Sequence, residues 1–263
     1  MKIAILGTGK MGAAMAKGLV HSGEQAWDIV LTNTTGNLPE TLRDLALPCL
    51  NSNVEAVGGA DMIILAVLPQ QYQKVLAEIK DAAQTDACLI SIAPGYTLEK
   101  LDQLTGGKLQ VIRAMPNTPA LIGEGMIAVC RGASMKDGTF MLAQRVLGVL
   151  GHTEAVSESQ LNAVIGVSGS APAYVYMFVD ALADAGVLGG LHRDQAVRMA
   201  AQMLYGSAAL LRETGKRPAE LREMVCSPAG TTIEAVASLE MDGFRGSVIK
   251  AARAAMEKAS RMG

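Results

Sequence analysis

The sequence predicts an α/β domain over residues 1–157 followed by an all-helical domain over residues 158–263. In the first part, short apolar runs alternate with segments of helical periodicity, a pattern typical of a mostly parallel sheet covered by helices on both faces. In the second part every segment has helical periodicity. Half of the residues are apolar but only 3% are aromatic, so we expect a core of small and aliphatic side chains.

Short apolar runs, bounded by glycine, proline and polar residues, mark the strands of the first part. The run 62–67 is continuously apolar, as expected for a strand that is buried on both faces. Two weaker runs are candidates for strands at the edge of the sheet, 127–130 and 155–156. The expected strands are 2–6, 29–32, 62–67, 88–92, 110–114, 127–130 and 155–156.

Segments of helical periodicity connect these strands and fill the second part. In the first part we expect helices at 12–21, 38–45, 71–80, 98–104 and 138–150. In the second part we expect them at 159–165, 171–185, 193–213, 219–225, 231–241 and 244–262. Glycine-, proline- and polar-rich breaks separate the later helices at 166–170, 186–191, 215–218, 226–230 and 242–243.

The first expected strand runs directly into a glycine-rich loop that opens a helix. The pattern G-x-G-x-x-G between a strand and a helix is the dinucleotide-binding fingerprint of Rossmann-type domains. Its first glycine allows a tight turn, the second lets the backbone approach a pyrophosphate, and the third lets the helix pack closely. The alternative is a purely structural glycine turn. The residues expected to bind the cofactor here are Gly7, Thr8, Gly9, Lys10, Met11 and Gly12.

The end of the second strand favours NADP over NAD. An NAD site usually places a carboxylate there to bind the ribose hydroxyls, but here Asn33, Thr34 and Thr35 follow the strand, and Asp28 stands at its other end. Hydroxyl and amide groups can donate hydrogen bonds to a 2′-phosphate, which a carboxylate would repel. We therefore expect NADPH as the hydride donor, with NADH as a second donor, while a simple polar turn is the alternative.

Two later strand ends should face the same crevice, because ligands of open α/β sheets bind outside the carboxyl ends of the strands. A proline-bracketed loop, 115–119, follows the next strand and would hold Asn117 toward a nicotinamide. Stiffening of these loops by their prolines is an equally good explanation. The strand-end residues expected at the cofactor are Ala66, Val67, Leu68, Pro69, Ile92, Ala93 and Pro94.

A loop of small residues in the second part, 226–230, opens the helix expected at 231–241. Thr231 followed three residues later by Glu234 predicts a capping box. The N–H groups of Gly230, Thr231 and Thr232 would then suit a carboxylate, by the same logic that seats phosphates at helix N-termini. An ordinary capped helix is the alternative.

Composition excludes several classes of function. The formal net charge of −2 and the absence of a basic cluster argue against nucleic-acid binding. The four cysteines stand far apart, without the spacing of a zinc site, so we expect no metal and reduced thiols in the cytoplasm. The N-terminal apolar stretch is too short for a signal peptide, and no unbroken apolar run suggests a membrane span.

Taken together, these motifs resemble the pyrroline-5-carboxylate reductase family over essentially the full chain. The glycine loop is common to dinucleotide enzymes, whereas the later motifs, in this order and spacing, are specific to that family. One departure is that some bacterial members carry an arginine where Thr34 or Thr35 stands, which leaves strict NADPH preference open. The matching segments are 7–12, 66–69, 115–120, 166–174 and 227–234.

The resemblance implies the function and the remaining site residues. It implies reduction of the cyclic imine 1-pyrroline-5-carboxylate to L-proline, the last step of proline biosynthesis, in a cytoplasmic enzyme. It also implies homodimers through the helical domain, assembled further into a ring of dimers, and an Asn53 that contacts the adenosine side of NADP. The substrate carboxylate would be held by Ser227, Gly230, Thr231 and Thr232, with the Thr232 hydroxyl near the ring nitrogen as the catalytic group.

Three other functions are alternatives to this expectation. A β-hydroxyacid dehydrogenase would need a catalytic lysine early in the helical part, but no lysine occurs between Lys136 and Lys216. A ketol-acid reductoisomerase would need a magnesium site of several carboxylates, and Asp180 and Asp184 have no matching acidic cluster. A non-catalytic NADP-binding sensor would show a degraded substrate loop, whereas the loop here is intact.

Overall fold

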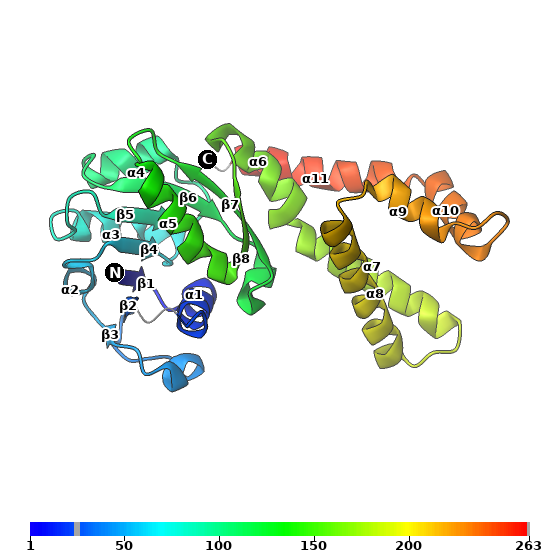
Figure 1. Ribbon diagram of the computed structural model, residues 1–263, viewed down its shortest axis with the longest axis horizontal. Coiled ribbons are helices and arrows are strands. Elements are labelled where there is room, and N and C mark those ends of the chain that lie inside the picture. The colour runs from blue at the N-terminus through cyan, green and yellow to red at the C-terminus, as the bar shows by residue number, and fades with distance from the viewer. Residues whose placement is uncertain (24–26, 262–263) are drawn as a thin grey trace. The chain divides into compact units, whose positions relative to one another are not determined.

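The computed structural model describes residues 1–23 and 27–261, which divide into two compact units. The first unit comprises Met1–Gly169 with Ala255–Gly263, and the second comprises Ser170–Ala254. The domain boundary that the sequence suggests after residue 157 stays a prediction. Figure 1 shows the elements of both units.

The described residues of the first unit form an eight-stranded sheet with the order β3-β2-β1-β4-β5-β6-β7-β8. All neighbouring strands are parallel except β6 and β7. The strand order reverses at β1, because β2 and β3 lie on one side of it and β4 to β8 lie on the other. The strands are β1 Lys2–Leu6, β2 Asp28–Thr32, β3 Cys49–Leu50, β4 Met62–Leu65, β5 Cys88–Ser91, β6 Gln110–Met115, β7 Gly125–Arg131 and β8 Gly151–Ala155.

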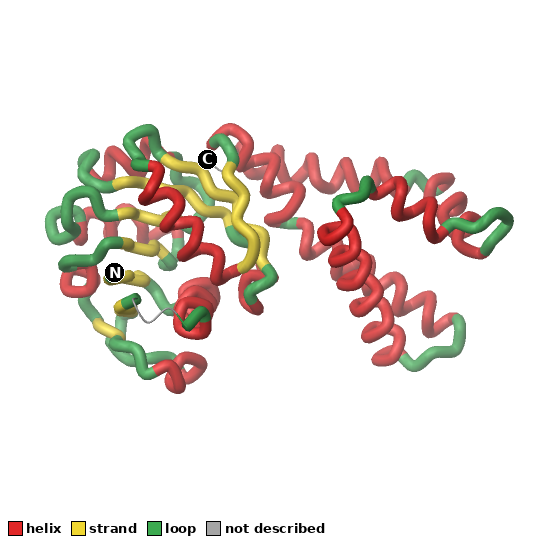
Figure 2. The backbone as a smooth tube through the Cα atoms, in the orientation of Figure 1, coloured by secondary structure: helices red, strands yellow, loops and turns green. Residues whose placement is uncertain are grey.

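Helices cover both faces of this sheet (Figure 2). Strand β1 shows why, because its alternate side chains enter opposite layers: Ile3 and Ile5 pack with α1 and α5, whereas Ala4 and Leu6 pack with α2 and α3. Both layers are apolar, as a doubly covered parallel sheet requires. The α-helices of the first unit are α1 Lys10–His21, α2 Asn53–Val57, α3 Tyr72–Ile79, α4 Leu98–Thr105, α5 Asp137–Leu147 and α6 Leu161–Val164.

The predicted α/β architecture is confirmed, with differences in detail. The segment 38–45 forms a 3-10 helix at Glu40–Leu45, and the strand expected at 62–67 ends at Leu65. The strand predicted at 127–130 is not an edge strand, because β8 pairs with it on its outer side. The sequence pattern does not reveal β3 and α2, since elements of two and five residues are too short to show periodicity.

The second unit is built from helices alone among its described residues, as predicted. Helix α7 packs against α8, and the Phe178 ring of α7 lies 6.2 Å from the Phe244 ring of α11. The helix expected at 244–262 is described to Ser260, and its last predicted residue, Met262, lies outside the described residues. The helices are α7 Ala171–Leu188, α8 Arg193–Thr214, α9 Pro218–Val225, α10 Thr231–Met241 and α11 Phe244–Ser260.

The break predicted at 166–170 was wrong. Residues Ile165–Gly169 form a π-helical turn, so that helix runs from α6 into α7. The glycines and serines of this segment are tolerated because a π turn occurs as a single wide turn inside a helix. Small side chains in this segment therefore changed the width of the helix without ending it.

Candidate functional site: a cavity at the switch point of the sheet

The glycine loop is shaped partly by its own packing and partly by an open face. Gly7 has φ +104°, and a Cβ added there would lie 2.8 Å from the Ala66 carbonyl oxygen. A Cβ at Gly12 would lie 2.1 Å from the Gly7 carbonyl oxygen, so α1 packs directly on the loop. A Cβ at Gly9 would have no described atom within 4 Å. Close packing thus explains Gly7 and Gly12, whereas Gly9 faces space in which a ligand could lie against the backbone.

A cavity of about 660 Å³ opens beside this loop, outside the carboxyl ends of β1, β2 and β4. This is the point where the strand order reverses, which is the usual ligand site of an open α/β sheet. The structure brings together nine of the residues predicted to bind the cofactor. They are Gly7, Thr8, Gly9, Asn33, Thr34, Asn53, Ala66, Val67 and Leu68.

Other predicted cofactor residues are not among those that line this cavity. Lys10 and Met11 begin α1, and Gly12 lies behind the loop. For these residues a role at the cofactor stays a prediction. The full set is Lys10, Met11, Gly12, Thr35, Pro69, Ile92, Ala93, Pro94 and Asn117.

Several cavity residues were missed from the sequence. Asn51 follows β3, a strand too short to predict, and Gln71, Lys74 and Glu78 lie about one helical turn apart on or just before α3. Their spacing places them on one side of a helix. The sequence could have suggested this face, but not that it turns toward the glycine loop. The missed lining residues are Thr32, Asn51, Gln71, Lys74, Val75 and Glu78.

Asn33 organises the turn after β2. Its Nδ2 donates to the Thr8 Oγ1 (3.1 Å) and to the Asn37 carbonyl (2.8 Å). Its Oδ1 accepts from the backbone N–H and the hydroxyl of Thr35, both at 3.0 Å, and from the Gly36 N–H at 2.8 Å. Such side-chain-to-backbone bonds are how asparagine stabilises turns. Thr35 thus takes part in a polar turn, which was the alternative to cofactor binding. Asn33 and Thr8 are hydrogen-bonded to each other and line the cavity with polar groups.

A second chain of hydrogen bonds links three residues across the cavity. Thr32 Oγ1 donates to Asn53 Oδ1 (2.7 Å), and Asn53 Nδ2 donates to Glu78 Oε2 (3.2 Å). Glu78 therefore brings a carboxylate to a site where the second strand supplies none. Lys74, one turn earlier on α3, brings a positive charge to the same cavity. The cavity holds groups suited to both a 2′-phosphate and free ribose hydroxyls.

Asn117 is held by backbone partners on two sides. Its Nδ2 donates to the Ser168 carbonyl (3.1 Å), in the π-helical turn, and its Oδ1 accepts from the Met126 N–H (2.9 Å) at the start of β7. The side chain thus fastens three segments of the first unit to one another. Its predicted approach to a nicotinamide stays a prediction.

The loop before α10 differs from the predicted capping box. Gly230, not Thr231, is the N-cap, Thr231 begins the helix, and among the described residues no side chain caps this end. The predicted capping box was wrong because the helix begins one residue earlier than the box requires, so that Glu234 is its fourth residue and not its third. The Ser227 hydroxyl lies against Gly230, where an added Cβ would be 2.2 Å from the Ser227 Oγ. The N–H groups of the first helical turn, including those of Thr231 and Thr232, lack intrahelical partners and can bind an anion.

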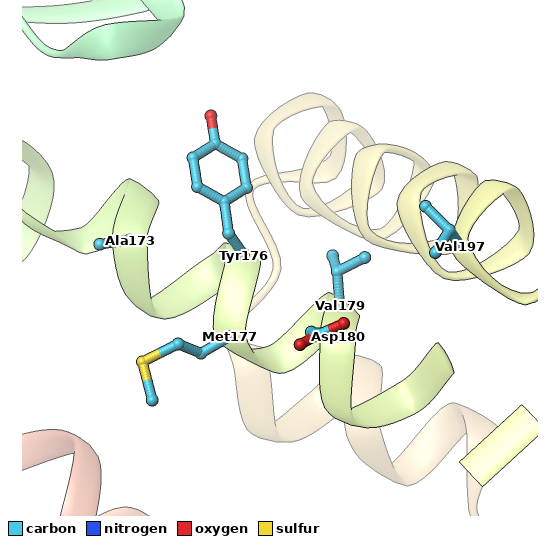
Figure 3. Close-up of a pocket in the computed structure, with 6 residues that line it drawn as sticks. All are labelled: Ala173, Tyr176, Met177, Val179, Asp180 and Val197. Carbon is cyan, nitrogen blue, oxygen red and sulfur yellow. The ribbon is translucent and has the colours of Figure 1, made fainter. Parts of the chain in front are cut away.

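A second cavity, of about 580 Å³, lies on the helical unit (Figure 3). All but one of its lining residues come from α7, and Val197 comes from α8. Asp180 there lies 3.6 Å from the Arg193 guanidinium, which also hydrogen-bonds Asp184. The two carboxylates are thus engaged in ion pairs. The lining residues are Ala173, Tyr176, Met177, Val179, Asp180 and Val197.

The surface of α7 is unusually apolar. Ala183 is the one buried residue of this helix within the described structure, whereas Met177 and Leu188 are 74% and 90% exposed. The helical stretch Glu158–Leu188 is long and apolar enough to cross a membrane by length and composition alone. An exposed apolar surface of this kind also marks a protein–protein interface.

Comparison with known proteins accounts for both parts of the chain. Residues 158–262 match the family model of pyrroline-5-carboxylate reductase dimerisation, and residues 2–95 match that of NADP oxidoreductase, coenzyme F420-dependent. The first of these matches includes all of α7, the helix with exposed apolar residues.

Full-length relatives agree. The chain is 42% identical to pyrroline-5-carboxylate reductase of Escherichia coli (strain K12), with 99% of this chain and 98% of the relative covered. It is 38% identical to pyrroline-5-carboxylate reductase 3 of Danio rerio, with 100% of this chain and 92% of the relative covered.

Solved structures show the same likeness. A pyrroline-5-carboxylate reductase from Coxiella burnetii superposes with a TM-score of 0.94 at 30% identity, covering 99% of this chain and 98% of that chain. Plasmodium falciparum pyrroline carboxylate reductase with NADP bound superposes with a TM-score of 0.84 at 29% identity, covering 100% of this chain and 98% of that chain. A 3-hydroxyisobutyrate dehydrogenase from Mycobacterium tuberculosis gives 0.53 at 19% identity, covering 72% of this chain and 66% of that chain, which shows a shared fold alone.

Proposed function

The chain belongs to the pyrroline-5-carboxylate reductase family, and we propose that it reduces 1-pyrroline-5-carboxylate to L-proline, the last step of proline biosynthesis. The family makes the chain an oxidoreductase with a nicotinamide cofactor. The observation that carries the proposal is the 42% identity to a named reductase over 99% of this chain. The cavity at the switch point supports it, because it offers the open glycine face that a dinucleotide requires.

We propose NADPH as the preferred donor, with NADH as a second donor. When bound, the reduced nicotinamide supplies a hydride. The backbone of Gly7–Gly9 would face the pyrophosphate, and the segment after β4 would face the nicotinamide side. Asn33, Thr34 and Lys74 would hold the adenosine side with its 2′-phosphate.

We propose that the loop before α10 binds the substrate. The N–H groups of Gly230, Thr231 and Thr232, with the Ser227 hydroxyl, would hold the carboxylate, and the Thr232 hydroxyl would hydrogen-bond the ring nitrogen. The hydride adds to the C=N carbon of the protonated imine, and the π pair becomes the nitrogen lone pair, which takes up a proton from water. Since a protonated imine is already electrophilic, the chain mainly has to align donor and acceptor.

The biological unit is proposed to be a homodimer through the helical unit, assembled into a larger ring. Support comes from the dimerisation model over residues 158–262 and from the exposed apolar residues of α7. We also propose a cytoplasmic location. All four cysteines, each within the described residues, are free thiols, which suits a reducing compartment.

The test is the oxidation of NADPH and, separately, of NADH by the purified protein with pyrroline-5-carboxylate, followed by nicotinamide absorbance. Rapid oxidation that depends on the imine is expected, faster with NADPH. If a folded protein that binds NADP⁺ oxidises neither donor, the proposed reaction is wrong. A thermal-shift titration that shows whether proline stabilises the protein only when NADP⁺ is also present helps to separate the reductase from a non-catalytic sensor.

A further inference from the structure

Two tyrosines link the exits of β4 and β5, next to the cofactor cavity. Tyr72, the first residue of α3, is fully buried. Its hydroxyl donates to the Leu65 carbonyl (2.8 Å) and accepts from the Ala93 N–H (3.1 Å), with the Ser91 hydroxyl at 3.4 Å. Leu65 is the last residue of β4 and Ser91 the last of β5. One phenol oxygen therefore joins the backbones of two strand exits.

Tyr96 makes the reciprocal connection. It lies beyond β5, and its hydroxyl donates to the Pro69 carbonyl beyond β4 at 3.2 Å. The rings of Tyr72 and Tyr96 pack with centroids 4.8 Å apart, and the Lys100 Nζ lies 4.7 Å from the centre of the Tyr96 ring. Each tyrosine thus starts from one strand exit and bonds the other. We call Tyr72 and Tyr96 the tyrosine clasp.

The clasp connects the two backbones just beyond the last paired residues of β4 and β5. The ladder between β4 and β5 pairs Leu65 with Ser91 as its last register position. Past it, the two backbones no longer bond each other as strands, and the segments 66–69 and 92–95 must be held in another way. The first of these segments carries Ala66, Val67 and Leu68 into the cavity wall. The bonds of the clasp to the Leu65 and Pro69 carbonyls lie on either side of the backbone that shapes this wall.

The position of the clasp indicates which half of a dinucleotide it affects. In a Rossmann-type domain the ribose of the adenosine half lies at the end of the second strand, and the pyrophosphate lies at the N-terminus of the first helix. Here these places are taken by Asn33 and Gly9. The β4 and β5 exits lie on the other side of the switch point, where the nicotinamide half would lie.

We propose that Tyr72 and Tyr96 are positioning residues that set the spacing of the β4 and β5 exits for the nicotinamide half of the cofactor. This inference rests on the proposed function, since it takes the ligand to be a nicotinamide dinucleotide. Removing the Tyr72 hydroxyl leaves the buried Leu65 carbonyl and Ala93 N–H without this partner, so the two exits shift to recover hydrogen bonds. The Asn33 turn on the adenosine side, all of it within the described residues, makes no bond to either tyrosine and stays in place.

The test compares the whole cofactor with its adenosine half. NADP⁺ and adenosine 2′,5′-bisphosphate are titrated calorimetrically into the full-length wild type, Tyr72→Phe, Tyr96→Phe and the double variant. We expect Kd for NADP⁺ to rise about fivefold to thirtyfold in Tyr72→Phe and less in Tyr96→Phe, while Kd for the bisphosphate stays within about twofold. In the double variant, Kd for NADP⁺ should rise by less than the product of the two single increases, because both tyrosines act on the same strand exits.

Controls separate positioning from loss of structure. Tyr205→Phe, at an exposed tyrosine of α8, should change neither affinity. In the enzyme assay, KM for NADPH should rise in the clasp variants while KM for the imine stays close to that of the wild type. If Tyr72→Phe fails to fold, Tyr96→Phe, at the half-buried position, carries the test alone.

Two outcomes would overturn the clasp: equal weakening of both ligands, which indicates general loosening, or an unchanged affinity for NADP⁺. Should the assay show NADH as the donor, NAD⁺ and AMP replace the two ligands. A wild type that binds NADP⁺ without reducing the imine refutes the proposed reaction and leaves the clasp open to confirmation. A wild type that binds no dinucleotide refutes both.

Discussion

At the scale of single residues, Lys74 and Glu78 set opposing charges one helical turn apart at the wall of the cavity. Glu78 is hydrogen-bonded through Asn53 to the end of β2, and we propose that it substitutes for the carboxylate that an NAD site usually carries on that strand. Lys74 supplies a cation where the expected arginine is missing. We propose that the balance between these two side chains sets the choice of donor.

We predict that Lys74→Met lowers kcat/KM for NADPH about fivefold, the size of a solvent-exposed contact to a phosphate, with little change for NADH. Glu78→Gln should raise the preference for NADPH. Lys80→Met, at the exposed end of the same helix, is the matched control. Steady-state kinetics with both donors measure this, and an equal loss with NADPH and NADH would show that Lys74 does not contact a 2′-phosphate.

Thr232 is expected to act through its hydroxyl. Thr232→Ala should lower kcat/KM for the imine about tenfold or more, because a hydrogen bond to a reacting nitrogen is lost, while folding stays intact. Thr232→Ser, which keeps a hydroxyl, should retain most of the activity. Kinetics and thermal unfolding of both variants make the measurement; an alanine variant with wild-type kinetics rules this role out.

The buried thiols give a pH dependence. Burial raises the pKa of Cys88 to about 12 and that of Cys130 to about 11, above the ordinary value of 9.0. Above pH 9 the unfolded chain loses these protons while the folded chain keeps them, so stability is fully present below this pH and is lost as the pH rises toward the folded values.

We predict that the free energy of unfolding falls by about 1 kcal/mol per buried thiol for each pH unit above 9. Urea denaturation between pH 7 and 10 measures it. Cys88→Ala should make the decline shallower, and Cys226→Ala, at a half-buried thiol, serves as the control. The same slope in wild type and Cys88→Ala would contradict the assignment.

At the level of secondary-structure elements, the Glu158 side chain connects its own segment to α4 and β6. Its Oε1 accepts from the Leu98 N–H that begins α4 (2.7 Å) and from the Arg113 guanidinium of β6 (2.5 Å). The Arg113 side chain is only 12% exposed. A partly buried pair of this kind is costly to break, because the remaining charge loses its partner away from water.

We predict that Glu158→Ala destabilises the protein by about 3 kcal/mol, which lowers Tm by roughly 6–12 °C for a protein of this size. Glu154→Ala, at an exposed glutamate of β8, should change Tm by less than about 2 °C. Differential scanning calorimetry at neutral pH decides the point, and a Glu158→Ala variant that melts with the wild type would show that the pair contributes little.

The element boundaries were predicted most accurately where the interactions that cause them are local in sequence. The glycine loop and α10 begin where sequence motifs placed them to within two residues. The π-helical turn was missed because its stabilisation is not local: Asn117, far earlier in the chain, donates to the Ser168 carbonyl. The cap of α10 lies one residue before the predicted one, at Gly230.

At the scale of the whole molecule, the helical unit leaves apolar side chains exposed. Met177 lies on α7 beside the cavity of that unit and is 74% exposed. A charge placed there would have to be buried in the proposed dimer, which costs several kcal/mol unless the charge is paired.

We therefore predict that Met177→Glu shifts the protein from a dimer or larger assembly to monomers at micromolar concentration. Sedimentation velocity over a dilution series is the measurement. Met141→Glu, at a methionine of α5 that is 69% exposed in the first unit, is the matched control. If both variants sediment like the wild type, the interface lies elsewhere.

Local sequence patterns alone predicted most strands of the sheet, most of the helices and the glycine motif that lines the cavity. These follow from local causes: continuous apolar runs make buried strands, and the spacing of Gly7, Gly9 and Gly12 allows one tight turn against one helix. The resemblance to the reductase family rested on the same local motifs.

Which residues from distant segments line the same wall of the cavity depends on the packing of the folded chain. Lys74 and Glu78 reach the cavity, and Tyr72 reaches the exit of β5, because parallel strands β1, β4 and β5 align their carboxyl ends. Such neighbours are joined by long crossovers, so nothing in the local pattern of α3 records which strand its polar face will meet. Register and packing across the sheet supply that information.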